Sequence, residues 1–184
     1  MPVFISLLRG INVMGRKIIL MADLKKVYEK SGFSEVKTYI QSGNVVFTSQ
    51  KKSVSELEEM IKAAIKNRFK FDVEILVLGL DELAEIVKKN PFSEYKLKTG
   101  ERIYFTILSG KPAKEKVAEL TMMKNSIDDF EIIGRTVYLL CRKGYAKSAF
   151  GNNFIEKILK AHGTTRNIET MKKLVEIGKS LRLT

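Results

Sequence analysis

The hydrophobic and polar positions of this chain form short strand-like runs and helical stretches in a regular order. Residues 3–8 are apolar on both alternating faces, which predicts a central strand. Residues 23–31 carry apolar side chains at helical spacing and end before Gly32, a residue type that often terminates helices. Further patterns predict a helix after a Ser53/Glu56 capping box and strands over 36–40, 45–48 and 73–78. The order strand-helix-strand-strand-helix-strand is the split βαβ pattern of a ferredoxin-like unit.

The same order of elements returns in the second half of the chain. Gly134-Arg135 is a two-residue hairpin turn with Gly first, which suits type II′. The turn joins two predicted strands, and another strand and two helices are expected around it. The five elements are predicted over residues 103–108, 113–123, 129–133, 137–141 and around 153–161.

These patterns predict an α+β fold with two ferredoxin-like repeats, βαββαβ and then βαββα, plus a C-terminal helix from about residue 168 to residue 179. The first repeat occupies residues 1–80. Residues 81–184 contain a linker helix that Asp81 can cap, the second repeat and the C-terminal helix. We expect the two repeats to pack as one unit. The internal duplication rests on the order of elements, because residue identity between the halves is slight.

Two polar, glycine-bearing loops end strands of the first repeat. Arg9-Gly10-Ile11-Asn12 follows the first strand, and Gln41-Ser42-Gly43-Asn44 joins the two hairpin strands. In a ferredoxin-like unit these two positions lie at the same edge of the sheet, so we expect the loops to be neighbours in space. The second repeat has Ser109-Gly110-Lys111-Pro112 and Gly134-Arg135 at the corresponding positions, without the Asn and Ser residues. Turn formation alone therefore does not require those residue types.

This edge is the candidate ligand site of the sequence. We expect it to bind a small polar or anionic ligand, with Arg9 neutralising charge, Asn12 and Asn44 orienting the ligand, Ser42 presenting its hydroxyl group, and Arg166 closing the site. A structural interpretation stays open, because Asn and Ser also fix turns by bonding to nearby backbone groups. Catalysis stays open too, since no general base stands out.

Arg166 lies just before the predicted C-terminal helix. A cation near a helix N-terminus is electrostatically unfavourable, so Arg166 requires a polar partner or reaches a ligand. Thr165 and Asn167 are both candidates for the N-cap of this helix.

Other chemical sites have weaker support. The segment Gly10 to Lys17 resembles a phosphate-binding P-loop only superficially, because no Ser or Thr follows the lysine and the helix starts too late. A more general anion site from Arg9, Arg16 and Lys17 stays open. His162 fits the end of a helix, and Cys141 fits a buried strand position.

No metal or cofactor is expected from this sequence. Asp128 and Asp129 are neighbours without a third ligand at a recognisable spacing, which does not favour a metal site. The single cysteine and the lack of a long apolar run predict a cytoplasmic protein with no membrane partner. Its oligomeric state stays open.

The net charge of +12 is unevenly distributed. Residues 1–80 carry 13 Lys/Arg and 8 Asp/Glu, residues 81–141 carry 10 of each, and residues 142–184 carry 10 and 3. This distribution supports an alternative function, a nucleic-acid-binding module that uses a basic C-terminal surface. A lysine-rich solvated surface explains the same charge. Strand 45–48 lacks the aromatic and basic signature of RNA-recognition domains.

The third hypothesis for the function, after ligand binding and nucleic-acid binding, is a structural or self-associating protein without a ligand.

Several motifs resemble one bacterial family, the domain of unknown function number 1697. They are Leu8-Arg9-Gly10-Ile11-Asn12-Val13, Met21-Ala22-Asp23-Leu24, Thr38-Tyr39-Ile40-Gln41-Ser42-Gly43-Asn44-Val45-Val46-Phe47, Lys147-Ser148, Asn153-Phe154 and Thr164-Thr165-Arg166-Asn167 with Thr170. The resemblance implies two ferredoxin-like repeats and assigns no reaction. Two departures from the family pattern are Met14, where the first glycine of a pair is usual, and Ile168, where tryptophan is common.

Overall fold

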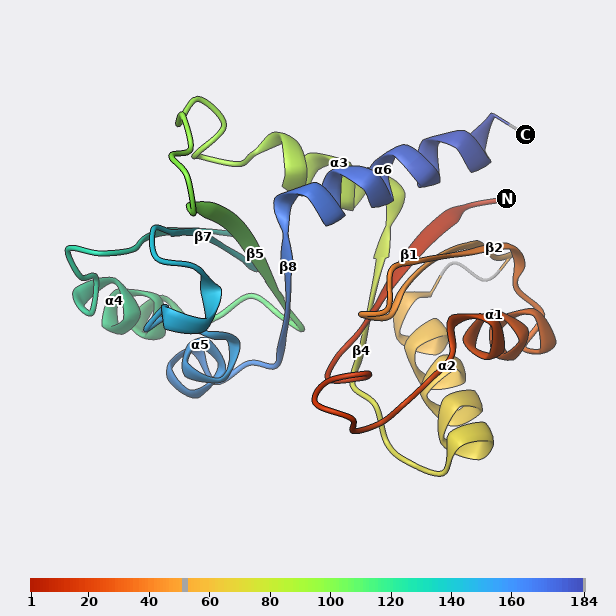
Figure 1. Ribbon diagram of the computed structural model, residues 1–184. Coiled ribbons are helices and arrows are strands. Elements are labelled where there is room, and N and C mark those ends of the chain that lie inside the picture. Colours follow the sequence, from red (N-terminus) through yellow and green to blue (C-terminus); the bar gives the residue numbers. More distant parts are fainter. Residues whose placement is uncertain (51–52, 184) are drawn as a thin grey trace. The chain divides into compact units, whose positions relative to one another are not determined.

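The computed structural model describes residues 1–50 and 53–183, which form two compact units (Figure 1). Unit 1 consists of residues 1–85 together with the C-terminal residues from 172, and unit 2 consists of residues 86–171. Helices α3 (Leu80–Lys88) and α6 (Ile168–Arg182) each begin in one unit and end in the other. No helix within the described residues is long and apolar enough to cross a membrane.

Unit 1 contains the first ferredoxin-like repeat. Its elements are β1 (Val3–Leu8), α1 (Met21–Lys30), β2 (Ser34–Tyr39), β3 (Asn44–Thr48), α2 (Val54–Phe69) and β4 (Ile75–Gly79). The four strands form one antiparallel sheet in the order β2-β3-β1-β4, and α1 and α2 pack on one face of this sheet. The six residues of β1 are all buried, as expected for the apolar central strand.

The core of unit 1 lies between the sheet and these two helices. The Tyr28 ring of α1 lies 5.8 Å from the Phe33 ring and 5.5 Å from the Phe47 ring. The Tyr28 hydroxyl shares a 2.6 Å hydrogen bond with the hydroxyl of Ser6, a polar side chain that β1 buries. Burial raises the pKa of Tyr28 well above its ordinary value. The hydrogen bond lets β1 carry a serine within an otherwise apolar core.

Unit 2 contains the second repeat. Its elements are β5 (Arg102–Leu108), α4 (Lys114–Met122), β6 (Asp129–Ile133), β7 (Thr136–Cys141), the short 3₁₀ helix η1 (Tyr145–Lys147), α5 (Asn152–Leu159) and β8 (Gly163–Asn167). The sheet order is β6-β7-β5-β8, which matches strand for strand the order in unit 1. Gly134 has a φ of 63°, which fits the predicted glycine-first turn between β6 and β7.

The structure confirms the predicted fold class of two ferredoxin-like repeats followed by a C-terminal helix. It also adds strand β8, which pairs with β5 and completes the second repeat. The Thr165 hydroxyl forms hydrogen bonds with Thr106 and Asn152. Polar contacts therefore stabilise this strand, which has no alternating apolar pattern. Asn167 is the N-cap of α6, because its Oδ1 accepts a 2.8 Å hydrogen bond from the Thr170 amide.

The predicted cap of the linker helix is wrong. Helix α3 begins at Leu80, so Asp81 lies in the first turn of the helix. The Asp81 carboxylate accepts a 2.8 Å hydrogen bond from Arg182 of α6. Gly178 of α6 lies so close to Leu80 that a Cβ atom added at position 178 would be 2.6 Å from Leu80 Cδ1. These contacts attach the C-terminal part of α6 to unit 1.

Candidate binding edge

The two glycine-bearing loops of unit 1 lie side by side, and we call residues 9–20 and 40–44 the loop edge. The amide of Leu8 donates a 2.8 Å hydrogen bond to the carbonyl of Gly43, and Leu7 pairs with Asn44 across the sheet. Asn12 Nδ2 donates to the carbonyl of Gln41 at 2.8 Å. The proximity expected from the strand order is therefore present.

Asn12 holds the long loop after β1 in its course. Besides its bond to Gln41, Nδ2 donates to the carbonyl of Ile19 at 2.9 Å, and Oδ1 accepts from the Ile19 amide at 2.8 Å. The backbone of Asn12 has a φ of 54°, a left-handed conformation that Asn tolerates better than most residues. Both N–H groups of the side-chain amide are used in the fold, so Asn12 positions the loop edge through backbone groups.

Asn44 has the equivalent role in the hairpin. Its buried side chain donates through Nδ2 to the carbonyl of Tyr39 at 2.9 Å and to the hydroxyl of Ser42 at 3.0 Å. These bonds close the turn between β2 and β3 around Gly43. Asn44 and Ser42 therefore shape the turn, whatever else they contact.

Gly43 permits the close approach of the two loops. Its φ is 77°, and a Cβ at this position would lie 2.7 Å from Ile11 Cδ1 and 2.8 Å from Leu8 Cβ. Any other residue would add backbone strain and push the hairpin away from the end of β1.

The tip of the loop edge is a tight turn over residues 13–16. Val13 and Arg16 form an isolated antiparallel bridge, and the Arg16 amide donates to the Val13 carbonyl at 2.9 Å. Met14 and Gly15 between them have φ values of 49° and 72°, the signs that a type I′ turn requires. A glycine pair satisfies this turn without strain, which explains why Met14 is a costly departure from the family pattern.

Left-handed backbone conformations gather in the loop edge. Of the fourteen described residues with positive φ, half lie there, namely Gly10, Asn12, Met14, Gly15, Lys17, Ile40 and Gly43. For a β-branched residue such as Ile40 this conformation is a genuine outlier. Strained backbone persists where surrounding contacts over-determine it, and such strain clusters at functional sites.

Three cations belong to the loop edge. Arg9 is half-buried, and its amide donates to the carbonyl of Glu74 at 2.9 Å. Lys17 Nζ donates to the carbonyl of Asp72 at 2.6 Å. Arg16 is exposed, and its guanidinium makes no hydrogen bond or ion pair with any described residue. The loop edge therefore carries a cation that the described fold does not use.

Exposed apolar side chains lie in the same two loops. They are Val13, Met14, Ile18, Leu20 and Ile40, and Met14 is 94% exposed. The hydrophobic pattern of the sequence misses this feature, because periodicity does not reveal the burial of apolar residues in an irregular loop. Apolar residues flanking Gly15 and Arg16 are the signal that was available. A surface that combines cations with exposed apolar groups is suited to binding.

The second repeat shares the backbone pattern but has no asparagine at the corresponding loop positions, residues 109–112 and 134–135. The amide of Leu108 donates to the Arg135 carbonyl at 2.8 Å, as Leu8 does to Gly43. The amide of Ser109 donates to the His162 carbonyl at 2.7 Å, as Arg9 does to Glu74. The backbone bonds therefore belong to the fold, whereas the asparagine network belongs to the first repeat alone.

Arg166 lies on β8 of unit 2, opposite Phe105 of β5. Its Nη1 donates to the carbonyl of Thr165 at 2.9 Å. Burial lowers the pKa of the Arg166 guanidinium to about 10, because the charged form loses solvation. Its predicted role in closing a site remains a prediction.

The other residues considered for chemistry, Cys141 and His162, lie in environments that fit structural roles. Cys141 is buried in the core of unit 2, and burial raises the pKa of its thiol to about 11, so it is a poor nucleophile at neutral pH. His162 is exposed and lies 3.8 Å from Glu156. No group of three His, Cys, Asp or Glu side chains in residues 1–50 and 53–183 is arranged to hold a metal ion.

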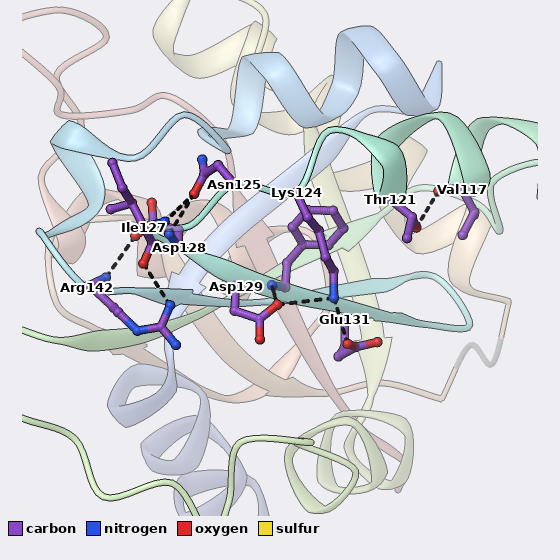
Figure 2. Close-up of polar contacts among 10 residues, drawn as sticks. Val117, Thr121, Lys124, Asn125, Ile127, Asp128, Asp129, Glu131 and Arg142 are labelled. Atoms are coloured by element: carbon purple, nitrogen blue, oxygen red, sulfur yellow. Dashed lines mark hydrogen bonds and ion pairs between the residues drawn. The ribbon is translucent and has the colours of Figure 1, made fainter.

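Asp128 and Arg142 take part in the structure around the start of β6 (Figure 2). Asp128 Oδ1 accepts a 2.9 Å hydrogen bond from the Arg142 amide, and Asn125 Oδ1 accepts from the amides of Ile127 and Asp128. The Arg142 guanidinium donates to the carbonyl of Ile127 at 2.7 Å and lies 3.9 Å from Glu101. A phosphate bound by Arg142 would compete with these contacts.

Asp129 belongs to a separate cluster beside this one. Lys124 Nζ lies 3.1 Å from Asp129 and 2.9 Å from Glu131, as Figure 2 shows. The two neighbouring aspartates have different partners. Asp128 Oδ1 accepts from the Arg142 amide, whereas Asp129 Oδ1 accepts from the Phe130 amide at 2.8 Å and pairs with the Lys124 ammonium. Their adjacency in sequence does not create a shared site.

The chain belongs to the family of proteins of unknown function DUF1697, whose model matches residues 1–138. The match includes the whole loop edge and ends before Arg166. The solved structure of a conserved bacterial protein from Streptococcus pneumoniae has the same fold, with a TM-score of 0.74 and 22% identity over 96% of this chain and 98% of that chain. No curated protein matches the chain.

Proposed function

We propose that this protein binds a small anionic ligand at the loop edge of unit 1. The observation that carries the proposal is the exposed Arg16 guanidinium, which has no partner among the described residues and extends from a tightly held turn. Arginine is well suited to carboxylate and phosphate groups, because its planar guanidinium forms two parallel hydrogen bonds.

The framework of the loop edge supports this proposal. Asn12, Asn44 and Gly43 fix two loops that are distant in sequence, so the cations extend from an ordered backbone. An ordered site loses less conformational entropy on binding than a flexible one. Arg9 and Arg16 supply the charge, while Asn12, Ser42 and Asn44 act by positioning.

The exposed apolar residues favour a ligand that also has an apolar part. Met14 and Ile18 flank Arg16 in the loop, and both side chains are largely in solvent. A ligand whose apolar part covers them would add burial to the charge interaction. Inorganic phosphate is therefore expected to bind more weakly than an organic anion.

A ligand screen tests the proposal. The melting temperature is measured with inorganic phosphate, with citrate and with ATP, and stabilising anions are titrated by heteronuclear NMR. Binding at the loop edge shifts the amide signals of Gly10, Gly15 and Gly43 in a saturable way. A screen in which no anion stabilises the protein, or in which no stabilising anion gives saturable shifts at these three glycines, refutes the proposal.

Charge-removing variants distinguish this site from general attraction to a basic protein. We expect Arg9→Ala and Arg16→Ala each to weaken binding by about tenfold, which is about 1.4 kcal/mol. Lys37→Ala removes the same charge from an exposed position on β2 and should weaken binding by less than about twofold. Equal weakening by all three variants would show that only net charge matters.

Arg166 has its own test. If Arg166 contributes to the site, Arg166→Lys weakens binding, because lysine cannot make a bidentate contact. Unchanged affinity in this variant removes Arg166 from the site and leaves the proposal for unit 1 intact.

A further inference from the structure

Unit 1 has a second surface whose positive charges form no ion pair with described residues, and one of its cations, the Arg68 guanidinium, lies 5.5 Å from the ring centre of Phe69. A groove of about 550 Å³ is lined by residues from the last turn of α1, from the last two turns of α2 and from the C-cap of each helix. We call it the helix-end groove, and its lining residues are Val27, Lys30, Ser31, Ala64, Asn67, Arg68 and Lys70.

The cations of the helix-end groove differ from their neighbours on the same helices. Lys25 pairs with Glu29, Lys66 with Asp72 and Lys62 with Glu74. By contrast, Lys30, Arg68 and Lys70 form no ion pair within residues 1–50 and 53–183, and none of the lining residues is acidic. Unpaired cations of this region therefore gather at the groove.

Helix ends explain only part of this charge. Cations are common near helix C-termini, where each helix contributes the equivalent of roughly half a negative charge. Two helices thus offset about one of the three positive charges that line the groove. The remaining excess favours an anion with more than one negative charge.

The rest of the lining indicates the kind of anion. Asn67 is exposed, and its side-chain amide has no hydrogen-bond partner among the described residues, so it is available as a donor and an acceptor. Val27 and Ala64 pack on the core of unit 1 and give the groove an apolar base. The groove volume lies in the range typical of small-molecule sites.

We infer that the helix-end groove binds an organic phosphate of nucleotide size. Arg68, Lys30 and Lys70 contact the phosphate groups, Asn67 bonds to a polar group of the organic part, and that part covers Val27 and Ala64. This site is separate from the loop edge and does not depend on the function proposed for it.

Heteronuclear NMR titrations with ATP and with pyrophosphate test the inference on the full chain. ATP should give saturable shifts at the amides of residues 30–31 and 67–70, and pyrophosphate should bind more weakly, because it lacks a part that covers the apolar base. Arg68→Ala should weaken ATP binding by about tenfold. Lys26→Ala, a control on the exposed face of α1, should change it by less than about twofold.

Three results would overturn the inference. The first is an absence of saturable shifts in the groove at millimolar ATP, in a protein whose other signals show an intact fold. The second is equal weakening by Lys26→Ala and Arg68→Ala, which would mean that only net charge matters. The third is a single-stranded RNA oligonucleotide that binds the groove more tightly than ATP, which would make the ligand a nucleic-acid backbone.

Discussion

Gly43→Ala is the substitution that most sharply tests how the loop edge is built. The new methyl group would lie 2.8 Å from Leu8 Cβ, an atom fixed to the central strand, and 2.7 Å from Ile11 Cδ1. Ile11 can move its side-chain end, but Leu8 Cβ moves only with the backbone. Overpacking of this kind costs about 1–3 kcal/mol.

The backbone of Gly43 adds a second cost. A φ of 77° is left-handed, and an alanine there costs roughly 1–2 kcal/mol, part of which is offset by the lower entropy of the unfolded chain. We therefore expect Gly43→Ala to lower the free energy of unfolding by about 2–4 kcal/mol.

Gly10→Ala is the matched control for this strain. Gly10 lies in the adjacent loop with a φ of 68°, and a Cβ added there would have no atom within 4 Å. Its substitution therefore carries the backbone cost without the steric contact. Both variants lie in unit 1 and are compared in urea unfolding followed by far-ultraviolet circular dichroism. Equal destabilisation by the two substitutions would refute the close approach of the two loops.

Three further predictions concern the core and the turn. Tyr28→Phe should lower the free energy of unfolding by about 1–2 kcal/mol, because Ser6 loses its partner, while adding Ser6→Ala to it should cost little more in a double-mutant cycle. Met14→Gly should raise the free energy of unfolding in urea by about 0.5–1 kcal/mol, because glycine adopts the left-handed conformation of this position without strain. Met14→Ala keeps the strain and should change the stability little. Destabilisation by glycine would contradict the type I′ turn. Burial raises the pKa of the Cys141 thiol to about 11, so the thiol of the unfolded chain ionises first as the pH rises. The free energy of unfolding should therefore keep the full contribution of this thiol below about pH 9 and lose it as the pH rises toward 11. Cys141→Ala should flatten this part of the pH profile, and an unchanged profile would show that the thiol does not contribute.

The sequence predicts the two sheets well, because their central strands are its most distinct apolar runs. Residues 3–8 and 103–108 each pair with strands on both sides, and the strand order follows from the order of elements. Strand β8 is not predicted, since hydroxyl contacts of Thr165 hold it and no apolar alternation marks it. A strand stabilised by polar contacts at the edge of a sheet leaves little trace in a hydrophobic pattern.

The sequence predicts where the loop edge lies but not what each side chain does there. Strand order alone brings the two loops together. The structural role of Asn12 comes from its hydrogen bonds to the backbone of Ile19, seven residues further along an irregular loop. Hydrophobic periodicity does not predict the path of such a loop. Likewise, Lys30 and Arg68 resemble ordinary cations at helix ends, and their common groove appears only when the two helices are packed.

The most direct test of the loop edge is the affinity of Arg16→Ala and Lys37→Ala, measured from the amide shifts of Gly10, Gly15 and Gly43, for the anion that gives the largest saturable shifts there among inorganic phosphate, citrate and ATP. Both variants lose one exposed positive charge of unit 1, and only Arg16 belongs to the loop edge. We expect NMR titration to give a dissociation constant about tenfold higher for Arg16→Ala and nearly unchanged for Lys37→Ala. Equal affinities in the two variants would contradict a binding site at the loop edge.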